Sequence, residues 1–380
     1  MAPWLNGLIL ASRALAPVQD GLSNRTLANV RSRLIESAKA SWELGVAAEA
    51  LTEFSWPALS VFERSAFPPP AHLNVSLNAS DVLEIAVKTV SRKPADSLAL
   101  IANQGSAADP ASIGVSVLLA NWTRPDLSVT AFANAAGGQL EHLLSQVPRS
   151  DQGAISHRED QVQLWSDFVY MVPPFIAYFG ALERGHGARA LLQIAYDQCR
   201  LYRDALRDES GLWRHVVYGD WQDDTHWGTG NGWAAAGMLR VLQALNHSSE
   251  ALFFSEHQAN LTHWIQEITT AAWSHQHEDG SLFNVIDDPT NFIDTSTTAL
   301  LASVTYRMAV FTNDNTSIPS ANKALTLIKN SIDADGWLQN TTDPYTFHSP
   351  IQPGAHSPEG QAFVLLLHAA HVAWRKFIST

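Results

Sequence analysis

Asp167 is a carboxylate whose surroundings could give it catalytic chemistry. It is the single acid in the apolar and aromatic stretch from Leu164 to Tyr178. A buried carboxylate is costly when it is ionised without a partner, so the side chain would either find a hydrogen-bond donor or keep its proton. In the second case it has the raised pKa that a general acid needs. The structural alternative is an acid that caps a helix or pairs with an arginine. Pro173 interrupts helical hydrogen bonding, so we expect the chain to kink or restart just beyond the acid.

Other polar and aromatic residues could surround such an acid. Asp109, followed by Pro110, is typical of a helix N-cap with proline in the first position, and it could alternatively be a second acid. The segment Gly211–Trp233 contains four tryptophans, two histidines and three aspartates, with glycines that would let the backbone approach a ligand. Its histidines, His215 and His226, lack the spacing of a helical zinc pair, and nucleotide-binding and serine-nucleophile motifs are absent. We therefore predict no metal and no cofactor.

Helices are expected to position these residues. Apolar residues recur at three- and four-residue spacing along most of the chain, and extended apolar alternation is scarce. The pattern predicts an all-helical protein, with helices over residues 26–54, 79–92, 112–122, 129–146, 186–206, 232–245, 252–273, 295–311, 320–331 and 360–377.

A weak repeat lies between the helices. An acid, a glycine and then an apolar or aromatic residue recur at intervals of roughly sixty residues, around Gly153, Gly211, Gly280 and Gly336. This is turn chemistry, in which the acid binds nearby backbone and the glycine adopts a positive φ. The spacing suits one helical hairpin with its loop, and six such units would fill the chain. We predict an all-α fold, a single (α/α)6 toroid over residues 26–380. Residues 1–25 would form an N-terminal segment, either a degenerate signal or an extension. The alternative is an irregular helical bundle.

Composition limits the partners and the location. A formal net charge of −13 argues against nucleic acid and anionic membranes, and no apolar run approaches the length of a membrane span. We expect a monomer. Cys199 is the one cysteine, so an intramolecular disulfide is excluded. An excess of N-x-[ST] acceptors nevertheless favours a secreted glycoprotein. The acceptors are Asn24, Asn74, Asn78, Asn121, Asn246, Asn260, Asn315 and Asn340.

The sequence around Asp167 resembles a known family. Residues 165–175, WSDFVYMVPPF, are similar to the motif that carries the catalytic acid of unsaturated rhamnogalacturonyl hydrolases and unsaturated glucuronyl hydrolases, glycoside hydrolase families 105 and 88. Residues 227–233, WGTGNGW, resemble the substrate loop of these families, and Asp109 falls where they have a second acid. Residues 41–43, SWE, resemble the aromatic opening to their funnel.

The resemblance implies a fold, a reaction and roles for residues. The family's fold is a toroid of six helical hairpins. Its reaction hydrates the vinyl ether of a 4-deoxy-4,5-unsaturated uronic acid at the non-reducing end of an oligosaccharide left by a lyase. By this likeness Asp167 donates a proton and activates water, and Asp109 orients the sugar or the water. The residues implied in substrate binding are Trp42, His215, Trp227, Thr229, Asn231 and Trp233.

Thr229 departs from the family pattern. Rhamnogalacturonyl enzymes of the family have an arginine there, whose planar fork suits a carboxylate in a way that a hydroxyl does not. Another cation could replace it, with Arg124, Arg158 and Arg214 as candidates by position. Otherwise hydroxyl and backbone donors suffice, or the substrate differs. We predict an unsaturated uronyl hydrolase acting on pectic oligosaccharides. The alternatives are a toroid hydrolase of a saturated glycoside and a non-catalytic carbohydrate-binding protein.

Overall fold

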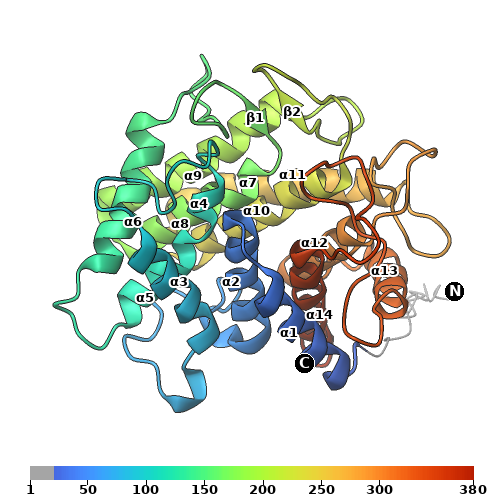
Figure 1. Cartoon of the computed structure of the whole chain (residues 1–380), viewed down its shortest axis with the longest axis horizontal. Coiled ribbons are helices and arrows are strands. Elements are labelled where there is room, and N and C mark those ends of the chain that lie inside the picture. The colour runs from blue at the N-terminus through green and yellow to red at the C-terminus, as the bar shows by residue number, and fades with distance from the viewer. Residues whose placement is uncertain (1–20) are drawn as a thin grey trace, which may run out of the picture.

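The fold is a closed ring of helical hairpins, which confirms the predicted (α/α)6 toroid. The structure is a computed structural model that describes residues 21–380. Within that range six inner helices contact one another in a closed cycle (Figure 1). In cyclic order they are α2 (Ser41–Ser55), α5 (Gly114–Thr123), α8 (Pro173–Leu182), α10 (Gly228–His247), α12 (Thr295–Thr312) and α14 (Pro358–Ile378).

An outer helix precedes each inner helix along the chain. The outer helices are α1 (Asn24–Ser37), α3 (Ser80–Arg92), α6 (Ala131–Glu141), α9 (Gly185–Leu206), α11 (Ser255–Trp273) and α13 (Ile318–Asn330). Burial explains which helices lie inside. In α9 and α13 the buried residues recur on one face, whereas α10 and α12 are buried almost all round and must be enclosed by other helices.

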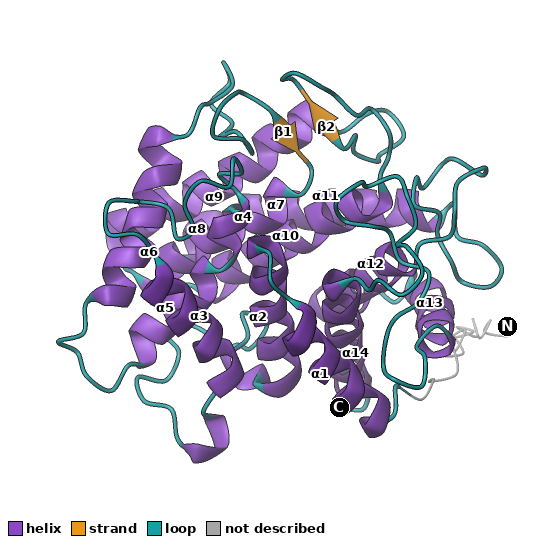
Figure 2. Cartoon of the chain, in the orientation of Figure 1, coloured by secondary structure: helices purple, strands orange, loops and turns teal. Residues whose placement is uncertain are grey.

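Short elements complete the ring. Two four-residue helices, α4 (Asp109–Ser112) and α7 (Phe168–Met171), precede α5 and α8 directly. The helical turns η1 (Pro57–Leu59), η2 (Val75–Leu77), η3 (His142–Gln146) and η4 (Ala251–Phe254) adjoin longer helices or loops. The strands β1 (Leu164–Trp165) and β2 (Val216–Val217) pair antiparallel among the loops at one edge of the molecule (Figure 2).

The helices predicted over 26–54 and 129–146 differ most from those observed, and the helix predicted over 252–273 begins as the turn η4 before α11. The helix predicted over 26–54 is interrupted at Ala38–Ala40, where the side chain of Glu43 accepts hydrogen bonds from the backbone of Lys39 and Ala40, both at 2.8 Å. That side chain stabilises a new helix start without a glycine or proline to mark it. The helix predicted over 129–146 begins at Ala131 and ends in the π turn η3.

The chain restarts at Pro173, as predicted from its inability to continue a helix. The predicted boundary near residue 25 stays a prediction, because residues 1–20 lie outside the described part. Among residues 21–380, no helix is both apolar enough and long enough to cross a membrane.

The predicted glycine turns are confirmed and share one hydrogen-bonding plan. Gly153, Gly211, Gly280 and Gly336 all have φ between +85° and +97°. The backbone N–H two residues after each glycine is bound by a buried side-chain oxygen at 2.8 to 3.1 Å. In the last three turns that oxygen belongs to the fourth residue of an inner helix, namely Asn231, Thr298 and Gln361. Each hairpin loop is thereby attached to the start of the next inner helix.

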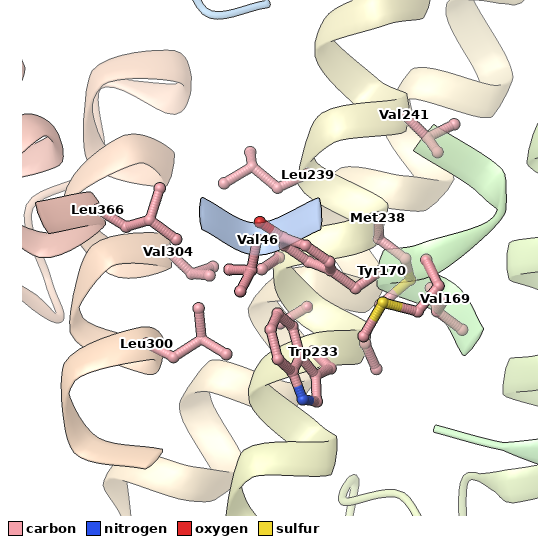
Figure 3. Packing of buried hydrophobic residues seen from close by; sticks show 14 of the residues in the cluster. Val46, Val169, Tyr170, Trp233, Met238, Leu239, Val241, Leu300, Val304 and Leu366 are labelled. Atoms are coloured by element: carbon pink, nitrogen blue, oxygen red, sulfur yellow. The ribbon is translucent and has the colours of Figure 1, made fainter. Parts of the chain in front are cut away.

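The centre of the ring is apolar but contains a group of buried ions. Figure 3 shows Trp233 and Tyr170 packed among aliphatic side chains from several inner helices. Arg240 of α10 lies over the Tyr170 ring at 4.6 Å and pairs with Glu53 of α2. Arg307 of α12 binds the other oxygen of Glu53 at 2.8 Å. These buried contacts join three inner helices. They also reach Tyr170 of α7, the short helix that follows Asp167.

Candidate active site

The site lies where the inner helices begin. Each inner helix is reached through an outer helix, so all six run in the same direction and their N-termini gather at one end. Residues at these N-terminal ends contact one another directly. Trp42 of α2 donates its indole N–H to Glu359 of α14, and the hydroxyl of Ser112 in α4 reaches the Ser41 carbonyl of α2 at 3.3 Å. Helix N-termini carry partial positive charge, so this end of the ring favours an anionic ligand.

Asp167 stands immediately before α7 and is 8 % exposed. Its Oδ2 lies 3.5 Å from Nε2 of His215 and accepts a hydrogen bond from the Ser166 hydroxyl at 3.3 Å. Burial alone would raise the pKa of this carboxyl, but the hydrogen bond and charge of His215 outweigh burial and hold it below its usual range. Of the two alternatives open from the sequence, the structure therefore shows the first: Asp167 has hydrogen-bonding partners, and its pKa is not raised.

His215 is also bound by a second acid, Asp223, through its other ring nitrogen. Its Nδ1 donates to Oδ2 of Asp223 at 2.8 Å, and the same oxygen accepts from Nε2 of His348 at 2.7 Å. Burial opposes the imidazolium, yet hydrogen bonds to Asp167 and Asp223 raise the pKa of His215. Burial would likewise raise the pKa of Asp223, but its two histidines lower it instead. The result is an imidazole fixed between two carboxylates that favour its charged form, one of which faces the site.

Asp109 occupies the start of α4, and its environment is the opposite of that of Asp167. The Ser106 hydroxyl accepts from the Asp109 backbone N–H at 3.1 Å, and Nε2 of His157 lies 3.7 Å from the Asp109 carboxylate. Burial and the nearby charge of Asp167 raise the pKa of Asp109 to about 7. Burial lowers the pKa of His157 to about 4, so this histidine is neutral. Below pH about 7 the proton of this pair of acids therefore resides mainly on Asp109.

Aromatic rings surround His215. Trp165 stacks on His157 with ring centres 4.6 Å apart, and Phe347 and Trp227 lie 4.8 and 4.5 Å from His215. Trp42 lies apart from this group, where it contacts Tyr345 at 5.5 Å beside Glu359. A cavity of about 340 Å³ opens beside them, lined in part by Glu43, Tyr345, His356 and Pro358. A larger cavity of about 600 Å³ lies between α1, α2 and α3, and its lining includes none of the acids or histidines described above.

The structure separates the predicted substrate-binding residues into two groups. Asp109, Asp167, His215 and Trp42 lie at the site, and Trp227 packs on His215 from within, donating its indole N–H to Asn284 at 3.0 Å. Trp227 is itself only 1 % exposed, and the other three are equally buried. Thr229, 1 % exposed, bonds to Asp294 and Thr297, while Trp233 packs against Tyr170 and Phe363.

Asn231 has no group left for a ligand. Its side-chain oxygen binds the Trp213 N–H, and its amide donates to the carbonyls of Trp213 and Trp227. The prediction that Thr229, Asn231 and Trp233 contact substrate is therefore corrected. The glycine-rich segment that contains them is the first turn and a half of α10 rather than an open loop.

Replacement of Asn231 tests this correction. Asn231→Ala leaves buried backbone groups of Trp213 and Trp227 without partners, which should lower the free energy of unfolding by about 1–3 kcal/mol. Urea denaturation measures the loss. The matched control is Gln198→Ala, which removes the equivalent contact at the Gly153 turn and should cost a similar amount. A raised KM in Asn231→Ala alone would restore it as a substrate-binding residue.

Four residues near the acids were missed by sequence reasoning. They are His157, Asp223, Phe347 and Glu359. No recognised motif contains Asp223 or His157, and Glu359 lies in the first turn of α14, where acids are common. Burial, with the charge of Glu43 and further acids of the site, raises the pKa of Glu359 well above its usual range. The one signal available was for Asp223, which is one of the three aspartates in the segment Gly211–Trp233.

His215, Asp223 and His348 also lie close enough to hold a metal ion, with candidate atoms within 4.8 Å of one another. However, one ring nitrogen of each histidine lies at hydrogen-bonding distance from a single carboxylate oxygen of Asp223. The contacts describe a hydrogen-bonded chain. The prediction of no metal and no cofactor stays a prediction.

Comparison with known proteins identifies the family of this helical toroid. Residues 78–349 match Glycosyl Hydrolase Family 88, and the chain belongs to this family. Among curated proteins it is similar to the unsaturated rhamnogalacturonyl hydrolase YesR of Bacillus subtilis, with 22 % identity over 236 residues. This match covers 59 % of the chain and 63 % of that relative's length.

Solved structures support the fold. A possible member of family GH105 from Klebsiella pneumoniae aligns with a TM-score of 0.73 at 17 % identity, over 99 % of this chain and 100 % of that one. A family 88 glycosyl hydrolase from Bacteroides vulgatus aligns with a TM-score of 0.67 at 16 % identity, over 92 % and 97 % of the two chains. The predicted resemblance to families 105 and 88 is thereby confirmed.

Proposed function

We propose that the protein releases a 4,5-unsaturated uronic acid from the non-reducing end of lyase-generated pectic oligosaccharides of the rhamnogalacturonan type. The observation that carries the proposal is a pair of buried acids whose pKa values are shifted in opposite directions, that of Asp109 up to about 7 and that of Asp167 down, at a helix-N-terminal end that favours anions. Similarity to an unsaturated rhamnogalacturonyl hydrolase supports this substrate, and membership of Glycosyl Hydrolase Family 88 supports a glycoside hydrolase.

The proposed reaction uses the single proton of the pair. C4 of the double bond takes the proton held by the pair, and positive charge develops at C5. Water attacks C5 while ionised Asp167 accepts its proton, so the pair ends with the same number of protons as it began. The hemiketal then collapses and the leaving sugar departs. His215, fixed by Asp223, keeps Asp167 ionised and oriented for this step. The cavity beside Tyr345 and Glu43 offers room for the leaving sugar.

The pH profile follows from the raised pKa of Asp109. Above pH about 7 this acid ionises, so the pair loses the proton that C4 needs and kcat/KM should fall. Below that value the proton is present, and activity should be level until Asp167 is protonated at low pH. Measuring kcat/KM against pH tests this. Asp109→Asn should lower activity and abolish the alkaline fall, and a fall that persists unchanged would contradict the assignment.

The decisive assay follows the ultraviolet absorbance of the conjugated enol ether in an unsaturated rhamnogalacturonan disaccharide. Loss of the band with release of the second sugar supports the proposal. An unchanged band with release of a saturated sugar from an undigested oligosaccharide would instead indicate a hydrolase of saturated glycosides. Binding without either signal would indicate a carbohydrate-binding protein.

We also propose that the protein is a secreted glycoprotein. Four of the acceptor asparagines, Asn24, Asn74, Asn78 and Asn340, are exposed. Digestion with an N-glycanase, after expression in a secreting eukaryotic host, should lower the mass of the exported protein. An unchanged mass, or retention inside the cell, would contradict this. A monomeric state, and the absence of nucleic-acid partners, stay predictions.

A further inference from the structure

Arg158 lies beside the acids, on a segment paired with the loop that carries Asp109. Ser106 and Arg158 form an antiparallel bridge. Two backbone hydrogen bonds flank it, from Ala107 to the His157 carbonyl at 2.8 Å and from Glu159 to the Gly105 carbonyl at 3.0 Å. The backbone at Arg158 is therefore fixed next to the start of α4, where Asp109 stands.

The guanidinium group rests on a glycine. A Cβ on Gly105 would lie 2.7 Å from Nη2 and 3.4 Å from Nη1 of Arg158, and Gly105 has φ of +72°. Only a residue without a side chain combines that conformation with so close an approach. The Nε atom donates to Asp160 at 3.3 Å, on an exposed carboxylate. Neither Nη1 nor Nη2 has a hydrogen-bond partner among residues 21–380.

The positive charge of Arg158 acts on ionisable groups of the site. It is among the groups that act on Asp109 and on His157, lowering the pKa of each. The guanidinium groups of the other two arginines proposed from the sequence already have partners away from the acids. Arg124 donates to the carbonyls of Asn121 and Leu127, and Arg214 donates to the Ala205 carbonyl at 2.9 Å and pairs with Asp224.

Thr229 is buried among Asp294 and Thr297, so a ligand carboxylate has no access to it. An anionic substrate placed between Asp109 and Asp167 would meet repulsion from Asp167 unless a cation compensates. Arg158 is the arginine whose Nη1 and Nη2 atoms remain available for that purpose, and a guanidinium binds a carboxylate through two parallel hydrogen bonds.

We propose that Arg158 is the carboxylate receptor of this site, with Nη1 and Nη2 binding the uronate of the substrate. This inference rests on the proposed function and assigns the uronide specificity to one residue. The site should then prefer a free uronic acid to its methyl ester, because the ester has no charge for the guanidinium to bind.

Equilibrium binding separates this inference from catalysis. Quenching of tryptophan fluorescence is followed on titration with galacturonate, a saturated uronic acid that the enzyme cannot hydrate, and with its methyl ester. The wild type should bind the acid more tightly than the ester. Arg158→Gln should weaken binding of the acid by roughly tenfold to hundredfold and leave the ester unchanged.

Arg214→Gln is the matched control, since it removes a guanidinium that is bound elsewhere, and it should bind the acid as the wild type does. Arg158→Lys keeps the charge without the fork, so it should recover part of the affinity. Thermal denaturation checks that each variant is folded.

Equal affinity of the wild type for acid and ester, or full retention of acid binding in Arg158→Gln, would overturn the inference. The ultraviolet assay of the wild type is run beside the titration. A band that persists there refutes the proposed hydration, while loss of uronate binding in Arg158→Gln would still support the receptor.

Discussion

Asp167→Asn should lower kcat on an unsaturated uronide by roughly a thousandfold, the size of effect expected when an acid–base group is removed. The amide has nearly the shape of the carboxylate but cannot accept a proton from water. It also loses the charge that His215 contacts at 3.5 Å. KM should change little, because the substrate is bound mainly by groups outside this carboxyl. Decay of the ultraviolet band under saturating substrate measures kcat directly.

The control for this variant is Asp224→Asn. Asp224 lies on the same loop as Asp223, but its side chain is 74 % exposed and its partner is Arg214. Its replacement should leave kcat within about twofold of the wild type, as expected for a solvent-exposed surface change. If Asp167→Asn kept more than a tenth of the wild-type kcat while remaining folded, the central role of Asp167 would have to be abandoned.

Glu53→Ala should produce the largest loss of stability. Glu53 is 5 % exposed and binds Arg240 and Arg307, which come from two other inner helices. Removing one partner of a buried ion pair leaves the remaining charge without compensation, at a cost of about 3–5 kcal/mol. Here two arginines lose a partner at once, although Arg240 also lies 3.7 Å from Glu49. Urea denaturation monitored by circular dichroism measures the change.

Glu36→Ala is the comparison for that experiment. Glu36 also pairs with an arginine, Arg33, but its side chain is 62 % exposed, so solvent screens the pair and its loss should cost less than about 1 kcal/mol. Similar losses in the two variants would mean that the buried cluster does not join the inner helices energetically. A large loss in Glu53→Ala alone would confirm that it does.

The ring of helices could be predicted because its sequence signals lie within short stretches of the chain. Helical periodicity is visible within a few turns, and the glycine turns are visible because positive φ favours glycine. The break between α1 and α2 was not visible, because it depends on Glu43 reaching back to bind two backbone N–H groups rather than on a residue that stops helices. A side chain that acts as a cap three residues later leaves little trace in a hydrophobic pattern.

The site was harder to predict because its properties depend on residues distant in sequence. Asp167 was identified as an acid in an apolar segment, but the direction of its pKa shift depends on His215 and, through it, on Asp223. Asp109 received its raised pKa from burial and from Asp167, neither of which shows in its local sequence. Thr229, Asn231 and Trp233 misled for the opposite reason. Their glycine-rich setting suggested a ligand loop, whereas those glycines allow α10 to pack closely against its neighbours.

The closure of the ring has a consequence for biosynthesis. The last inner helix, α14, packs on both α1 and α2, and Glu359 at its start receives the indole N–H of Trp42. During translation we therefore expect the surface of the first hairpin that contacts α14 to stay exposed until the sixth hairpin has emerged from the ribosome. Folding chaperones would then bind the surface of α1 and α2 that α14 later covers. We therefore expect the ring to close, and the contact between Trp42 and Glu359 to form, only after the sixth hairpin has been synthesised.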